Sequence, residues 1–239
     1  ENLISAVHWA ANGPEPTGYR DASVVVLHAG SSDGSCSVLP GCATRKYHSS
    51  RRDAFKSINQ EPIAHVKIGP EGPSIEMGDA VGFDARPEAI SPMMFDESTR
   101  IAQFVADAHL HPDLVQAAID ADYDALLFHG TGLGHLPIAD PQEDSPENTR
   151  LRIMLADYCT AGGIVVVVTQ TIHGPIHMDV YDKGRDQQEM GIIGHGSLCP
   201  PSSALIKLHH LLSRDEGRDA VAEGWESDLV GENPPDALS

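Results

Sequence analysis

The chain has 239 residues, 41% of them hydrophobic, and 35 acidic residues against 16 lysines and arginines give a net charge of −19. This length can bury a sizeable core in one large domain or two modest ones, and the composition excludes a disordered chain. The charge disfavours general nucleic-acid binding and is typical of a halophilic cytosol, where salt screens self-repulsion. The longest fully apolar run, residues 164–168, is too short to cross a bilayer, so we expect a cytoplasmic protein.

The four cysteines, Cys36, Cys42, Cys159 and Cys199, show no CxxC spacing. Cys36 and Cys42 with His48 are the best candidates for a metal site, but zinc sites normally have tighter paired spacing. We therefore expect unligated thiols in a reducing cytosol and no bound metal.

The first elements are a helix and a strand. Residues 2–11 carry Leu3, Val7, Ala10 and Ala11 at helical spacing, which predicts one apolar helix face. A valine-rich run over residues 23–28 then predicts a short buried strand.

Turns dominate the next part of the chain. Residues 30–34 place a serine beside an aspartate, which suits a nucleophile, but Ser, Asp and Gly also favour a plain turn for backbone reasons. Residues 37–46 predict a hairpin that turns at Pro40–Gly41 and leaves Lys46 at a strand end, facing inward, with Arg45 on the opposite face. A second hairpin is predicted at residues 69–73.

From residue 98 onward, helices alternate with short apolar strands, which predicts a small parallel α/β sheet. The expected strands cover residues 125–129 and 164–168, the second being central and buried on both faces. The expected helices have apolar faces at Ile101, Phe104, Val105 and Ala108; at Leu114, Val115, Ala118 and Ile119; at Leu151, Met154, Leu155 and Tyr158; and at Leu205, Leu208, Leu211 and Leu212.

The carboxy-terminal segment is acidic. Residues 215–239 contain eight acids and one base, with Pro234–Pro235 near the end. A short helix could dock through Val221 and Trp225, and we expect the last ten residues to be mobile.

A glycine-rich turn follows the first of the two predicted parallel strands. Residues 130–134 read GxGxG and not GxGxxG, so a dinucleotide site is disfavoured. Glycines here favour a sharp turn at the carboxyl end of the sheet, where open α/β sheets bind ligands.

Positive charge is concentrated in one stretch, residues 44–59. Within twelve residues this acidic chain places five cations against the single acid Asp53: Arg45, Lys46, Arg51, Arg52 and Lys56. Such a stretch indicates an anion-binding or charge-relay site, or else a solvated basic loop. A nucleic-acid-binding module is disfavoured because aromatic residues are not interleaved with the cations.

Lys46 followed by Phe55–Asn59 resembles the lysine motif of the asparaginase/glutaminase family. Residues 51–55 make it most similar to the archaeal Glu-tRNA(Gln) amidotransferase D branch of that family. Further family segments are resembled, in the same order, by residues 130–137, 169–175, 178–181, 184–185, 191–193 and 204–208. The resemblance implies an α/β fold, with residues 1–80 as part of a large domain, 81–95 as linker, 96–212 as a small α/β domain and 213–239 as an acidic tail.

The resemblance also implies roles for individual residues. Lys46 matches the lysine that relays charge to threonine nucleophiles, and such weak nucleophiles need a neighbouring base. His135 and Tyr181 stand where plain asparaginases carry asparagine and glutamate, so a small-amino-acid asparaginase is disfavoured. Arg51 and Arg52 are expected at the periphery of the site or at an interface.

By resemblance, a threonine hydroxyl attacks the amide of glutamine or asparagine, and water releases the acyl group. The freed ammonia passes to a partner, the E subunit of the amidotransferase, which uses ATP and Mg²⁺ to convert Glu-tRNA(Gln) to Gln-tRNA(Gln). A homodimer and tRNA(Gln) contact within the complex are expected, with no cofactor in this chain.

The family's threonine motifs, Thr-Gly-Gly-Thr and His-Gly-Thr-Asp-Thr, do not occur in the chain. The simplest expectation is a fragment of a longer enzyme that is inactive alone. The alternatives are an L-asparaginase-like amidohydrolase and a shortened, catalytically inert interaction subunit.

Overall fold

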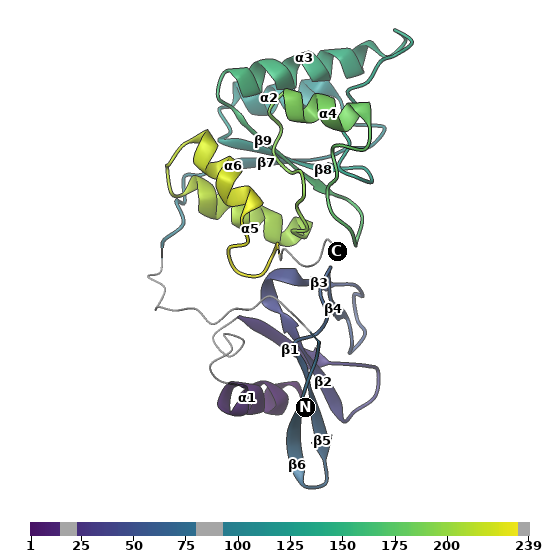
Figure 1. Cartoon of the computed structure of the whole chain (residues 1–239), viewed down its shortest axis with the longest axis vertical. Coiled ribbons are helices and arrows are strands. Elements are labelled where there is room, and N and C mark those ends of the chain that lie inside the picture. The colour runs from purple at the N-terminus through teal and green to yellow at the C-terminus, as the bar shows by residue number, and fades with distance from the viewer. Residues whose placement is uncertain (15–22, 80–92, 234–239) are drawn as a thin grey trace. The chain divides into compact units, whose positions relative to one another are not determined.

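A computed structural model describes residues 1–14, 23–79 and 93–233 of the chain (Figure 1). The chain divides into two compact units, residues 1–92 with 228–239, and residues 93–227. Within the described residues, no helix is long and apolar enough to cross a membrane. The predicted linker at 81–95 lies mostly outside the described residues, as do the last six residues of the predicted mobile end.

The first unit is built on a four-stranded antiparallel sheet in the order β1-β2-β5-β6. Its elements are α1 (Asn2–Asn12), β1 (Val24–His28), β2 (Ser35–Pro40), β5 (Ala64–Gly69) and β6 (Gly72–Met77). The predicted turn at 69–73 is confirmed, because Gly69 pairs with Gly72 where β5 turns into β6.

The predicted hairpin over residues 37–46 is wrong. Strand β2 ends at Pro40, a 3-10 turn (Gly41–Ala43) follows, and β3 (Thr44–Lys46) instead pairs with β4 (Phe55–Ser57) in a separate two-stranded ribbon. Both edges of β2 are already occupied by β1 and β5, so β3 cannot fold back onto it.

Helix α1 is confirmed, but its predicted face is wrong. Leu3, Val7, Ala10 and Ala11 are exposed, and Trp9 is the apolar residue that packs against Val38, Ile63, Ala64 and Val66 of this unit. Trp9 is 2% exposed and is the large side chain through which the helix docks on this cluster.

The second unit contains a parallel sheet in the order β7-β8-β9, which confirms the α/β class. Helices α2 and α3 cover one face of this sheet, and α5 and α6 cover the other (Figure 1). The elements in chain order are β7 (Ile101–Val105), α2 (Pro112–Asp120), β8 (Ala125–Gly130), α3 (Pro146–Thr160), β9 (Ile164–Thr169), α4 (Asp182–Glu189), α5 (Pro201–Leu212) and α6 (Arg218–Glu226).

Three predictions for this unit need correction. Residues 101–105 form strand β7 and not a helix, because they pair in parallel with residues 125–129. Strand β8, not β9, is central, although β9 is buried along its whole length as expected. In α2, Leu114 is exposed while Val115 and Ala118 are buried.

The acidic carboxy-terminal segment has two parts. Helix α6 forms as expected and buries Val221 and Trp225 in the second unit. Residues 228–233 belong to the first unit, where Cys42 Sγ donates to the Val230 carbonyl at 3.3 Å.

Candidate functional site

The two-stranded ribbon of β3 and β4 carries the predicted catalytic lysine. Lys46 lies opposite Phe55, and its ammonium is 5.7 Å from the centre of that ring. Arg45 lies opposite Lys56, and both Arg45 and Lys46 are exposed in the described structure. Because both side chains are exposed, their exposure does not show which of the two faces inward. The relay role of Lys46 stays a prediction.

The next cations in the stretch are paired within the first unit. Arg51 holds the nearly buried Asp53 through two parallel bonds, Nε to Oδ1 at 2.8 Å and Nη2 to Oδ2 at 2.9 Å. Lys56 Nζ lies 3.4 Å from Asp53 Oδ2. The Arg51 hydrogen bond is the main reason that the pKa of Asp53 is lowered.

Arg52 is also paired, with the last residue of β1 and with the loop that follows it. It forms an ion pair with Asp33 and donates from Nη2 to His28 Nε2 at 2.6 Å. Glu1 Oε2 lies 3.3 Å from the same nitrogen of His28, and the Glu1 carboxylate accepts the Gly34 backbone N–H. Asp33 thus lies in the turn after β1 and takes part in an ion-pair network.

These pairs show how the basic stretch is organised. Arg51, Arg52 and Lys56 are neutralised inside the unit, so the stretch is an organised charge network and not an open cationic patch. Glu1, His28 and Asp33 could hold a cation by composition, but the Arg52 guanidinium already occupies that position. Arg45 and Lys46 are the cations of the stretch for which no ion pair is found among the described residues.

The predicted metal candidates have other contacts. Cys36 Sγ donates to Asn2 Oδ1 at 3.5 Å, and His48 Nδ1 accepts the backbone N–H groups of Ser50 and Arg51, each at 3.1 Å. His48 thus organises the turn that precedes Asp53.

In the second unit, the glycine turn after β8 presents His135. The turn closes through backbone bonds between Thr131 and His135, and Gly132 and Gly134 have φ values of +51° and +97°. A Cβ on Gly130 would lie 2.6 Å from the Gly134 carbonyl carbon, so the two glycines pack backbone against backbone. The turn is a sharp reversal at the carboxyl end of the sheet, as predicted.

His135 and Tyr181 come together although 46 positions separate them in the sequence. Their rings meet edge to face with centroids 5.5 Å apart, and Tyr181 stands at the N-cap of α4 with its ring exposed. His135 Nε2 is buried without a hydrogen-bond partner among the described residues. Burial, aided by Lys183, lowers the pKa of His135, which favours a neutral imidazole able to bind a polar group.

Two polar residues that sequence reasoning missed hold this turn. Gln187 is fully buried in α4 and bonds to both sides of His135, accepting from Leu136 N at 2.8 Å and donating to the Gly134 carbonyl at 2.9 Å. Thr169, at the end of β9, donates from Oγ1 to the Gly132 carbonyl at 2.5 Å and contacts the Thr171 hydroxyl at 2.8 Å. The signal for Gln187 in the sequence is weak because α4 has no apolar stripe.

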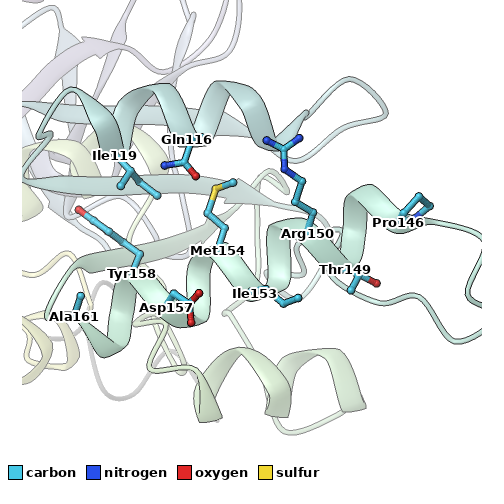
Figure 2. Close-up of a pocket in the computed structure, with 10 residues that line it drawn as sticks. All are labelled: Gln116, Ile119, Pro146, Thr149, Arg150, Ile153, Met154, Asp157, Tyr158 and Ala161. Carbon is cyan, nitrogen blue, oxygen red and sulfur yellow. The ribbon is translucent and has the colours of Figure 1, made fainter.

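A shallow groove lies between α2 and α3, with a volume of about 600 Å³. Figure 2 shows Gln116 and Ile119 of α2 facing Met154 and Tyr158 of α3 across it. Arg150 on its rim is ion-paired with Asp113 at 2.5 Å and with Glu147 at 3.5 Å. The groove has an apolar floor and a neutralised rim, and it contains none of the predicted site residues.

Known families match both units. The family model described as Glutaminase/Asparaginase C-terminal domain matches residues 100–223, and the one described as Asparaginase, N-terminal, matches residues 1–76. The D subunit of glutamyl-tRNA(Gln) amidotransferase from Methanococcus maripaludis is 31% identical over 236 residues, covering 97% of this chain and 50% of that protein. Its counterpart from Methanopyrus kandleri is 31% identical over 237 residues, covering 97% and 47%.

Solved structures share the fold. L-asparaginase I from Vibrio cholerae superposes with a TM-score of 0.73 at 25% identity, covering 97% of this chain and 61% of that one. The thermostable L-asparaginase from Thermococcus kodakarensis gives 0.68 at 22% identity with the same coverage. The chain spans about half the length of the curated relatives it matches. With one family model alone covering more than half of its residues, the chain belongs to the glutaminase/asparaginase family.

Proposed function

We propose that this chain is part of the ammonia-supplying subunit of a tRNA-dependent amidotransferase. The subunit would free ammonia from glutamine or asparagine for the conversion of Glu-tRNA(Gln) to Gln-tRNA(Gln). The observation that carries the proposal is the match to amidotransferase D subunits, which extends over 97% of the chain at 31% identity.

Lys46 is the residue of this chain that we assign to catalysis. It stands on a short, paired strand whose position is fixed by three register pairs with β4. Next to it, the Arg51–Asp53–Lys56 network holds the segment that returns from β3 to β4. In the proposed reaction, Lys46 supports proton removal from a threonine nucleophile supplied by the enzyme as a whole.

The His135–Tyr181 pair supports the amidotransferase branch, because these two residues stand where plain asparaginases carry asparagine and glutamate. A neutral, half-buried imidazole packed on a tyrosine ring offers one hydrogen-bonding nitrogen and no negative charge. The pair can therefore offer a hydrogen bond to a polar neutral group.

The proposal includes the other components of the reaction. A partner, the E subunit, would bind ATP and Mg²⁺, the D subunit would form a homodimer, and tRNA(Gln) would be contacted through the complex. Because Arg51 and Arg52 are engaged with Asp53 and Asp33, we assign them to the architecture of the site or an interface, and not to direct tRNA contact. The reaction places the protein in the cytoplasm, and its net charge of −19 suits a salt-rich one.

The test uses the full-length enzyme assembled with its partner. Lys46→Ala should abolish glutaminase activity while leaving assembly with the partner intact, and Arg45→Ala on the same strand is the matched control and should keep it. Glutaminase turnover near that of the parent enzyme in Lys46→Ala would contradict the assigned role.

An L-asparaginase-like amidohydrolase is the second candidate, favoured by the structural similarity to the Vibrio cholerae enzyme. It predicts rapid hydrolysis of free asparagine without tRNA, ATP or partner. The first candidate predicts hydrolysis that rises when Glu-tRNA(Gln), ATP and partner are added together. Partner binding without hydrolysis under either condition would instead indicate an inert interaction protein.

A further inference from the structure

Three metal-ligating side chains outside the site described above gather on the second unit. His177, Asp179 and His195 each offer a ligand atom, and these atoms all lie within 4.8 Å of one another. His195 Nε2 is 3.4 Å from Asp179 Oδ2, and the two imidazole rings meet edge to face at 5.4 Å.

The backbone around residues 176–179 explains why two of these side chains share one face. Ile176 and Met178 are buried in the core, so His177 and Asp179, one position further along in each case, point outward together. The segment is anchored on both sides. Ile176 exchanges backbone bonds with residues 196 and 197 at 2.9 Å, and His177 N donates to the Leu133 carbonyl at 3.1 Å.

His195 reaches the same place from a glycine turn. A Cβ on Gly194 would lie 2.5 Å from the Val167 carbonyl oxygen, and Gly196 has a φ of +76°, so both neighbours of His195 need glycine. Met178 N donates to His195 Nδ1 at 3.1 Å, which orients the ring and directs Nε2 toward Asp179.

The donor set has a defined chemistry. Two imidazoles and one carboxylate are the ligands of open zinc sites and of other first-row divalent metals. A tetrahedral ion with bonds of roughly 2.0 Å separates its ligands by about 3.3 Å, close to the distance between His195 Nε2 and Asp179 Oδ2. Gln188 Nε2 donates to Asp179 Oδ1 at 2.8 Å, which holds the other carboxylate oxygen in place and is the main cause of the lowered pKa of Asp179.

We propose that His177, Asp179 and His195 form a binding site for a divalent transition-metal ion of the Zn²⁺ type, with water in the remaining positions. The ion would tie the segment at 176–179 to the turn at 194–197. When the ion binds His195 through Nε2, the ring proton must sit on Nδ1. Nδ1 can then no longer accept the hydrogen bond from Met178 N. The affinity is therefore weaker than that of a closed structural zinc site.

The test is a calorimetric titration of the full chain, freed of metal with EDTA, with Zn²⁺ alone. We expect one equivalent to bind, with affinity at least about tenfold lower in His177→Ala and in Asp179→Asn. His173→Ala removes an exposed histidine of the same loop that is not one of the three proposed ligands, and its affinity should match the parent chain. Zn²⁺ should also raise the melting temperature of the parent chain and of His173→Ala but not of the other two variants.

Melting curves in EDTA establish that each variant folds, so loss of binding is not confused with unfolding. Binding by His177→Ala and Asp179→Asn at the parent affinity would overturn the proposal. Equal weakening in His173→Ala would overturn it as well, because it would mean that surface histidines bind the ion without a defined site.

Discussion

Gln187 and Gly134 are joined by a hydrogen bond of 2.9 Å between a side chain with no solvent exposure and the carbonyl of a glycine turn. The same side chain accepts the Leu136 N–H at 2.8 Å, so one residue of α4 fixes the backbone on both sides of His135. Tyr181 stands at the N-cap position of the same helix. The position of His135 against Tyr181 is therefore set by a buried contact between two segments that are 51 residues apart.

Gln187→Ala should leave the Gly134 carbonyl and the Leu136 N–H buried without partners. We expect the free energy of unfolding to fall by about 2–4 kcal/mol in a urea titration, since each orphaned buried group costs about 1–3 kcal/mol and water relieves part of that. Gln116→Ala is the control, because Gln116 bonds the side chain of Asp120 at the surface and should cost less than about 0.5 kcal/mol. Equal losses in the two variants would mean that Gln187 does not hold the turn.

Gly134→Ala tests the shape of the same turn. Its φ of +97° disfavours any L side chain, and a Cβ there would lie 2.6 Å from Cδ1 of the buried Ile176. We expect a loss of about 3 kcal/mol from strain and overpacking together. Gly132→Ala should cost about 1 kcal/mol, because its φ of +51° lies in the left-handed region and nothing lies within 4 Å of the new Cβ. Urea unfolding of both variants measures the two losses of unfolding free energy. A smaller loss for Gly134→Ala than for Gly132→Ala would contradict the prediction.

How much of the fold the sequence predicts depends on how local the signal is. The apolar runs of β8 and β9, the helix α3 and the tight turn after β5 all rest on neighbouring residues, and all were predictable. The prediction for residues 101–105 is wrong because so short a segment, with four apolar residues around Gln103, fits a helix face and a strand equally well. Only its pairing with β8 decides, and that pairing is a long-range contact.

The site is harder to predict for the same reason. Lys46, His135 and Tyr181 could be named from motif resemblance, and the contact between His135 and Tyr181 could not. The sequence could not show that Arg52 is paired, because Asp33, the acid that pairs with it, lies in the loop after β1. Gln187 sits in an eight-residue helix of polar composition, where no apolar periodicity marks the buried position.

The Arg51–Asp53 pair predicts an acid-dependent loss of stability. The folded pKa of Asp53 is lowered from 3.8, so its contribution is fully present above that value and is lost as pH falls through the folded pKa. The parent chain should unfold at higher urea than Asp53→Asn at pH 7, and the difference should shrink below about pH 4. Glu71→Gln removes one exposed charge from the same unit and serves as the control. A difference between parent and Asp53→Asn that is constant with pH would contradict the pairing.

Lys207 provides a test of the packing between α5 and α6. The ammonium is buried, donates to the Trp225 carbonyl at 2.9 Å and to the Ser227 carbonyl at 2.5 Å, and lies 5.6 Å from the centre of the Trp225 ring. It thus satisfies carbonyls at the end of α6, where a helix has no partners of its own. Lys207→Met keeps the length and apolar stem of the side chain but removes the donors, so we expect the free energy of unfolding to fall by about 2–3 kcal/mol in urea.

Lys67→Met is the matched control for Lys207, because Lys67 is an exposed strand residue whose ammonium lies 3.3 Å from Glu76. Such a surface ion pair is worth roughly 0–1 kcal/mol, so the control should remain close to the parent chain. Hydrogen exchange of the α6 amides distinguishes a local loosening of α6 from a general loss of stability. Only Lys207→Met should speed exchange there. If Lys207→Met unfolds at the same urea concentration as the parent chain, water replaces the ammonium at these carbonyls and the buried lysine does not hold the end of α6.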